Sequence, residues 1–155
     1  MNYRIRGLDP EAFSRFYGLS DGQLAELGVI RCAVDACPGF PDRVEMRDME
    51  AGETALLLNY EHLPVTSPYR SCHAIFVREG AERAYDREGV VPEVMKRRLI
   101  ALRGFDDRGF MLEADVAEGD AIEPLIGRMF ADPAVKYIHA HNARQGCFAG
   151  LIERA

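Results

Sequence analysis

The chain has 155 residues, of which 48% are hydrophobic and 28% charged, and it carries a formal net charge of −6 at pH 7. These values are ordinary for a globular protein with one domain over residues 1–155, and they exclude disordered and fibrous chains. The acidic balance argues against nucleic acid or an anionic membrane as a partner, because both bind proteins through a basic surface.

The N-terminal part of the chain predicts one strand followed by two short helices. Residues 2–7 alternate as a strand does. Asp9 followed by Pro10 predicts a helix start, with the carboxylate as N-cap and the proline at the first helical position. Ser20 followed three residues later by Gln23 has the pattern of a capping box and predicts the second helix.

Strand signals dominate the rest of the chain. The predicted strands cover residues 29–34, 43–47, 54–61, 72–79, 99–105, 110–116, 135–141 and 147–153. Residues 106–109 form a compact turn between two of them, and the last two strands form a closing hairpin. Residues 120–130 have apolar side chains at helical spacing, so this helix should lie on a sheet face.

This order of elements predicts the fold class. A parallel sheet would need a crossover helix between most strands, and such helices are missing. We therefore expect an α+β domain with a mainly antiparallel sheet, two short N-terminal helices and one longer helix before the C-terminal hairpin.

The chain lacks signals for export or membrane insertion. No apolar run approaches the roughly 20 residues of a spanning helix, and residues 1–9 lack the apolar segment of a signal peptide. We expect a cytoplasmic protein in which the cysteines are reduced thiols; these are Cys32, Cys37, Cys72 and Cys147. The basic run over residues 96–98 is interpreted as a solvated surface.

The most informative stretch runs from His139 to Cys147. His139 and His141 are two residues apart on a predicted strand, so their side chains point to the same side of the sheet. Cys147 shares that side if residues 142–146 form the loop, and it points to the opposite side if Asn142 pairs with it. The sequence leaves this register open.

Three interpretations of the cluster are open as well. A metal ion would be held by His139 and His141, with a third ligand from His62, His73 or Cys147. Alternatively, Cys147 is a nucleophile and one of the two histidines is its base. In the third interpretation the histidines are hydrogen-bonded residues of the sheet and the thiol serves packing.

A loop before residue 73 is the candidate second wall of a ligand pocket. Tyr69 and Arg70 offer a ring and a planar fork of donors that suit a small anionic ligand. His73 follows on the next predicted strand and should face the core, while Asn142 would orient an imidazole or contact the ligand. Glycine-rich phosphate loops are absent from the sequence, which disfavours nucleotide cofactors bound through them.

Four segments together resemble a known family: residues 56–62 (LLLNYEH), 67–71 (SPYRS), 73–79 (HAIFVRE) and 139–147 (HAHNARQGC). The family is an uncharacterised bacterial one, family 1203 of the series of domains of unknown function, and the resemblance covers nearly the whole chain. It implies a bacterial, cytoplasmic, single-domain protein. It implies no activity and no catalytic residues.

The sequence therefore favours a small-molecule-binding domain. The domain is also a candidate enzyme, although the sequence defines no reaction. His139, His141 and Cys147 are the candidate catalytic residues. The alternative is a non-catalytic structural or protein-interaction domain. Metal content, cofactor and oligomeric state are left open.

Overall fold

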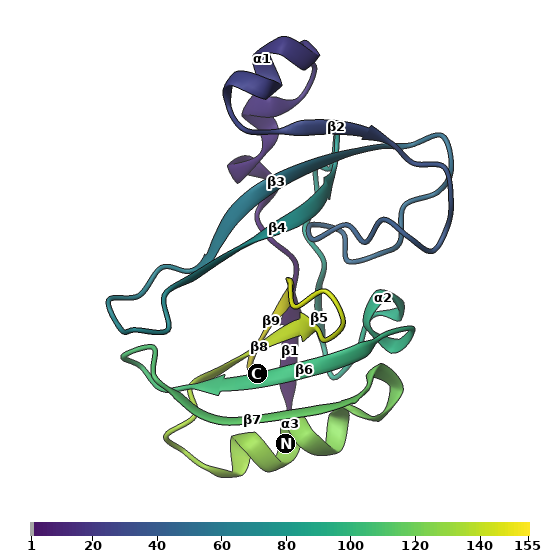
Figure 1. Ribbon diagram of the computed structural model, residues 1–155. Coiled ribbons are helices and arrows are strands. Elements are labelled where there is room, and N and C mark those ends of the chain that lie inside the picture. Colours follow the sequence, from purple (N-terminus) through teal and green to yellow (C-terminus); the bar gives the residue numbers. More distant parts are fainter. Residues whose placement is uncertain (1) are drawn as a thin grey trace.

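Two antiparallel sheets form the protein, as the computed structural model of residues 2–155 shows (Figure 1). The larger sheet has, in spatial order, the strands β5 (Asp86–Glu88), β1 (Tyr3–Arg6), β9 (Phe148–Arg154), β8 (Tyr137–Asn142), β6 (Leu99–Phe105) and β7 (Met111–Glu118). The smaller sheet has the strands β2 (Ile30–Ala33), β3 (Thr54–Leu63) and β4 (Ser71–Arg78). The expected α+β class with antiparallel pairing is confirmed.

Short helices cover the smaller sheet, and a longer one covers the larger sheet (Figure 1). The helical elements are η1 (Pro10–Ala12), η2 (Ser14–Phe16), α1 (Asp21–Glu26), α2 (Glu93–Lys96), η3 (Gly119–Ala121) and α3 (Glu123–Ala131). Both N-terminal start signals are confirmed. Asp9 accepts a hydrogen bond from the Glu11 amide, and Ser20 and Gln23 form both bonds of a capping box. The first element is a pair of 3₁₀ turns and not an α-helix.

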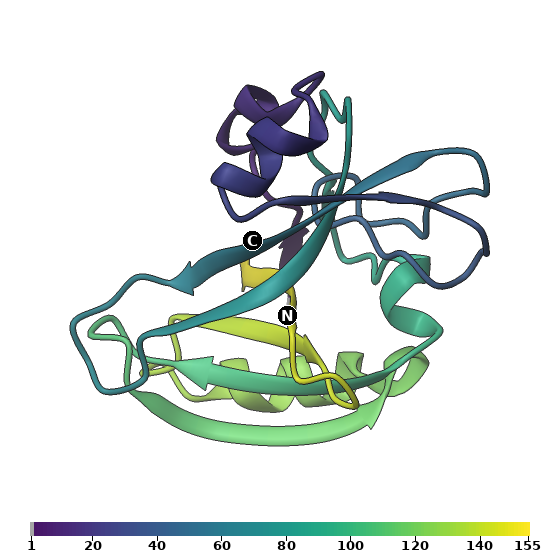
Figure 2. The same cartoon turned by 45° about the horizontal axis from the view of Figure 1, so that its top comes forward.

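Separate apolar cores hold the helices on the sheets. Ile126 and Phe130 of α3 pack in one core with Ile138 and Ala140 of β8. A second core joins the N-terminal helices to the smaller sheet; its members include Phe13, Phe16, Leu24, Leu56, Ile75 and Val77. The β3–β4 hairpin crosses over the larger sheet on the side opposite to α3 (Figure 2). The residues of β8 that alternate with Ile138 and Ala140 therefore face the smaller sheet.

The strand expected over residues 43–47 is not formed, and the prediction was wrong. This segment makes isolated bridges at its edges only, Pro41 with Asp48 and Asp42 with Phe76. The carboxylate of Asp42 is the physical reason. It accepts the backbone N–H groups of Val44, Glu45 and Arg78 at 3.1, 2.8 and 2.9 Å, so the first two are not available to a neighbouring strand.

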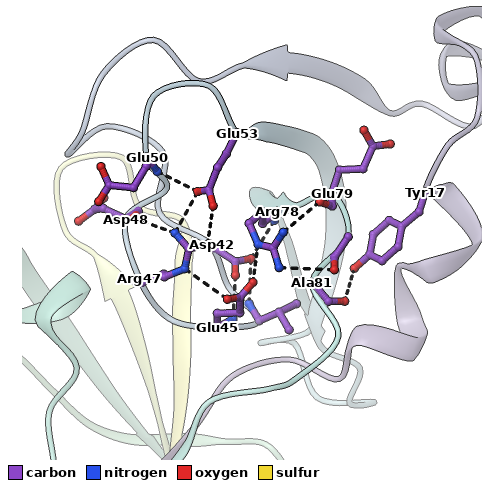
Figure 3. Close-up of polar contacts among 12 residues, drawn as sticks. Tyr17, Asp42, Glu45, Arg47, Asp48, Glu50, Glu53, Arg78, Glu79 and Ala81 are labelled. Carbon is purple, nitrogen blue, oxygen red and sulfur yellow. Dashed lines mark hydrogen bonds and ion pairs between the residues drawn. The ribbon is translucent and has the colours of Figure 1, made fainter.

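Charged side chains fix the rest of this loop (Figure 3). Arg47 makes two hydrogen bonds to Glu53, at 2.7 and 2.9 Å, and a third to Glu45 at 3.3 Å. Arg78 of β4 also donates to Glu45, which ties the loop to the smaller sheet. Residue 43, between these anchored positions, is thereby held against the larger sheet.

A close backbone approach supports the same loop from the other side. Leu8 donates its N–H to the carbonyl of Arg43 at 2.8 Å, and a Cβ atom added to Gly7 would overlap the carbonyl oxygen of Val44. We predict that Gly7→Ala lowers the free energy of unfolding by about 1–3 kcal/mol, because the backbone has to shift. Urea denaturation measures this change.

Gly127 in α3 is the matched control. A Cβ atom there would meet no other atom within 4 Å, so Gly127→Ala should stabilise the protein by about 0.5–1 kcal/mol through helix propensity. Equal effects of the two substitutions would contradict the close approach at Gly7.

Candidate functional site

All four histidines of the chain meet between the two sheets. His62 comes from β3, His73 from β4, and His139 and His141 from β8. Nδ1 of His73 lies 2.8 Å from Nε2 of His62, and Nδ1 of His62 lies 3.2 Å from Nδ1 of His139. The rings of His62 and His141 are edge to face with centroids 5.0 Å apart. We call these four residues the histidine cluster.

The register of the C-terminal hairpin, open in the sequence, decides what lies beside the cluster. Phe148 pairs with His141, and a bulge follows between this pair and that of Ala140 with Gly150. The phenyl ring of Phe148 stacks on His62 at 4.9 Å with an interplanar angle of 7°. Cys147 is instead the partner of Asn142, whose N–H donates to the Cys147 carbonyl at 2.9 Å. The thiol therefore points away from the face that carries His139 and His141.

The tautomer of His141 follows from one hydrogen bond. Its Nδ1 lies 3.0 Å from the carbonyl oxygen of Gly146, which can only accept, so Nδ1 carries the proton. Nε2 then holds a lone pair, and it is buried without a hydrogen-bond partner among residues 2–155. Buried polar atoms rarely lack partners.

Burial keeps these imidazoles neutral. It lowers the pKa of His139 and of His141 to about 3 and the pKa of His62 to about 4, because the protonated rings would lose their hydration. The other rings and the guanidinium of Arg103 on β6 lower these pKa values further. Each ring therefore has one unprotonated nitrogen at neutral pH.

A pocket adjoins the cluster, between the β3–β4 hairpin and the turn from β8 to β9. Its volume is about 390 Å³, a size typical of small-molecule sites. Its lining residues are Gly39, Pro41, Arg43, Leu57, His73, Ala74, Phe76, Arg98, Asn142, Gln145 and Cys147. We call it the inter-sheet pocket. One wall is apolar and comes from the smaller sheet, and the opposite wall is polar.

Arg43 and Cys147 are in contact at the polar wall. Nη2 of Arg43 donates to Sγ of Cys147 at 3.1 Å, and Nδ2 of Asn142 approaches the same sulfur at 3.7 Å. The other protein acceptors of Arg43 are uncharged, namely the carbonyls of Phe148 at 2.9 Å and of Pro41 at 2.6 Å. Arg43 is 3% exposed, and burial lowers its pKa, although arginine stays protonated in proteins.

Arg98, on the same wall, differs because its charge is balanced. It makes a two-pronged pair with the carboxylate of Asp48, at 2.6 and 3.0 Å, and that side chain is almost fully buried. The interpretation of residues 96–98 as a solvated surface was therefore wrong for Arg98, because a carboxylate 50 residues away in the sequence draws it inward.

The structure separates the predicted site residues into three places. His139 and His141 lie in the histidine cluster, Asn142 and Cys147 lie at the inter-sheet pocket, and His73 belongs to both. Tyr69 and Arg70, the predicted anion binders, lie outside this pocket. Arg70 is exposed and pairs with Glu61 at 2.9 Å, while Tyr69 packs against Phe105 and Phe110.

Arg43 is the residue of this site that the sequence did not reveal. It lies in a segment that was expected to be a strand, and its partners Phe148 and Cys147 are more than 100 residues away. No local pattern marks such a contact. The nearby proline- and glycine-rich turn over residues 38–41 was the one signal that the segment is a loop.

The fold and the site define a class: an α+β domain of two antiparallel sheets, with a polar pocket and a cluster of neutral histidines between them. The chain belongs to the family described as proteins of unknown function (DUF1203), whose model matches residues 39–154. The matched region contains the whole histidine cluster and the whole lining of the pocket. No match was found among curated proteins or among solved structures. Within residues 2–155, no helix has the length and apolar character needed to cross a bilayer.

The tautomer of His141 is directly testable. We predict that ¹⁵N NMR of the imidazoles, recorded in the presence of a chelator, shows His141 protonated at Nδ1 and bare at Nε2. This state should persist from pH 7 to about pH 5, where an ordinary histidine with a pKa near 6.5 is protonated. The pKa of His141 is lowered to about 3, so its ring stays neutral until the pH falls to that value.

His73 is the internal reference for this measurement. It is less buried than His141, although burial lowers its pKa as well. A protonated His141 ring at pH 5, or a proton on Nε2, would contradict the assigned hydrogen bond to Gly146.

Proposed function

We propose that this domain binds a small anionic molecule in the inter-sheet pocket, with the negative group at Arg43. The observation that carries the proposal is the buried charge of Arg43, which has no carboxylate within ion-pair distance among residues 2–155. Buried charges in proteins are normally paired. A ligand anion in the pocket would supply the missing partner.

The hydrogen-bond capacity of Arg43 supports the same conclusion. A guanidinium has five N–H groups, and Arg43 uses three of them, toward Pro41, Cys147 and Phe148. Two remain for a ligand, and planar forks of this kind suit carboxylate and phosphate groups. Asn142 and Gln145 add amide groups to the same wall.

The opposite wall favours a ligand that also has an apolar part. Leu57, Ala74 and Phe76 line it from β3 and β4. A second, smaller hollow shares Arg98, Asn142 and Gln145 with the pocket and adds Arg97 and Arg144. Arg97 and Arg98 both pair with Asp48, and Glu118 also lines the hollow. The three arginines thus outnumber the carboxylates by one, and this excess positive charge would attract anions.

The test is a set of NMR titrations with inorganic phosphate, acetate and hexanoate as probes, monitored at the amide signals of Asn142, Gln145 and Cys147. We predict saturable shifts in the wild type, with hexanoate bound more tightly than acetate because its chain reaches the apolar wall. Arg43→Gln should weaken binding by at least about tenfold, since a charge-assisted hydrogen bond contributes about 1.5–3 kcal/mol.

Arg70→Gln is the matched control, because it removes the same charge outside the pocket and should leave binding unchanged. Ala74→Phe fills the pocket without changing charge, so it should also abolish binding if Arg43→Gln fails to fold. Equal binding by Arg43→Gln and Arg70→Gln, or no saturable shift with any probe, would overturn the proposal. The alternative of a non-catalytic interaction domain would then be favoured.

A second candidate function, thiol chemistry in the same pocket, is supported by the contact between Arg43 and Cys147. The guanidinium of Arg43 donates to the sulfur of Cys147 inside the pocket, and reactive cysteines are often found beside such cationic groups. His139 and His141 do not hydrogen-bond the thiol within residues 2–155, so the proposal assigns them no role as its base. A cytoplasmic location belongs to this proposal, since all four cysteines are unpaired, as suits a reducing compartment.

Alkylation kinetics test the thiol candidate. We predict that iodoacetamide labels Cys147 about tenfold faster than Cys72 near neutral pH, because the guanidinium of Arg43 lies beside the Cys147 sulfur and cysteines next to arginine are more reactive. Cys72 is the more exposed of the two, so accessibility alone predicts the reverse order. Mass spectrometry of the labelled peptides gives both rates, and Arg43→Gln should slow Cys147 whereas Arg70→Gln should not. Faster labelling of Cys72 would exclude thiol chemistry and leave anion binding intact.

A further inference from the structure

We propose that His62, His139 and His141 form a binding site for a divalent transition metal ion of the zinc type, supported by His73. This inference does not rest on the anion pocket, and a different set of atoms carries it. One nitrogen from each of the three rings lies within 4.8 Å of the others, and all three side chains are buried.

The spacing of the nitrogens agrees with metal coordination. Two imidazole nitrogens bound to one zinc ion at 2.0–2.1 Å in a tetrahedron are about 3.3 Å apart. Nδ1 of His62 and Nδ1 of His139 are 3.2 Å apart. The two sheets therefore already hold one pair of donors at the required separation. The nitrogen of the third ring, which lies within 4.8 Å of the others, has to approach by up to about 1.5 Å.

The buried Nε2 of His141 is the second observation. Its lone pair lies in the interior without a hydrogen-bond partner among residues 2–155, and His141 has no exposed surface. The ring proton lies on Nδ1, which donates to the Gly146 carbonyl, so the lone pair of the ring lies on Nε2. A metal ion would be the natural partner of such a lone pair.

The remaining hydrogen bonds have the pattern found around metal-binding histidines. Such rings bind the ion through one nitrogen and donate the N–H of the other to a carbonyl or another acceptor, which fixes the tautomer. His141 does this through Gly146. His62 does it through His73 if its Nε2 donates to Nδ1 of His73, which leaves Nδ1 of His62 as the ligand atom.

The chemistry of the donor set selects the ion. Three neutral imidazoles suit zinc, copper, nickel and iron, whereas calcium and magnesium require oxygen ligands. Arg103 lies opposite His139 in the neighbouring strand and repels a cation, so only a strongly coordinating ion would be retained. Three histidine ligands leave a fourth position for water or another ligand, as in catalytic zinc sites. His73, which contacts His62 and lines the pocket, would lie between the ion and a pocket ligand.

The experiment uses the whole protein, purified without chelator for elemental analysis and then stripped and titrated with Zn²⁺ and Co²⁺. We expect about one transition metal ion per chain, and a cobalt spectrum of tetrahedral nitrogen coordination without sulfur-to-metal charge transfer. His62→Gln, His139→Gln and His141→Gln should each abolish stoichiometric binding. His73→Gln should weaken it by about 10–100-fold, as the loss of an outer hydrogen bond does.

Cys147→Ser is the matched control and should bind as the wild type does, because the sulfur points away from the cluster. Near-ultraviolet circular dichroism of each metal-free variant checks folding. If His141→Gln does not fold, two measurements still test the proposal. One is the cobalt spectrum of the wild type, and the other is metal binding by His62→Gln, whose substitution lies on the other sheet. Absence of both co-purified metal and Zn²⁺ binding would overturn the proposal. Unchanged Zn²⁺ binding by a folded His139→Gln variant, or a thiolate band in the cobalt spectrum, would do the same.

Discussion

The burial of β8 on both of its faces is the constraint on which the site depends. Ile138 and Ala140 pack toward α3 in the apolar core, and the alternation of the strand then sends His139 and His141 toward the smaller sheet. The apolar side fixes the register, because a shift by one residue would bring imidazoles into the core. Apolar packing on one face of β8 thus holds His139 and His141 in position on the other face.

The second half of the site depends on a loop that is held by charge. Asp42 accepts three backbone N–H groups, and this arrangement keeps the segment that contains Arg43 from forming a strand. Arg43 then reaches across to β9 and the turn before it, so it connects the loop to the C-terminal hairpin. The histidine cluster and the pocket therefore have different supports, one apolar and one electrostatic.

Local patterns in the sequence predicted the elements that local interactions form. The capping box of Ser20, the closing hairpin and the shared face of His139 and His141 are all consequences of residues close together in the chain. The expected strand at 43–47 failed because a side chain, Asp42, took the hydrogen bonds of the backbone. The sequence pointed to Arg70 and not to Arg43, because it does not show that Glu61 pairs with Arg70 or that Arg43 is buried beside Phe148.

The bulge at the start of β9 separates the imidazoles of β8 from the thiol of Cys147. By pairing Phe148 with His141, it places an aromatic ring against the imidazoles and turns the neighbouring sulfur away from them, toward Arg43 in the inter-sheet pocket. Oxidation or alkylation of the Cys147 thiol would thus leave the imidazole nitrogens of the histidine cluster unchanged. A metal ion bound to those nitrogens would in turn leave the thiol free to react. Without the bulge, Ala149 would pair with His141 and Phe148 with Asn142, so the phenyl ring and the thiol would exchange faces.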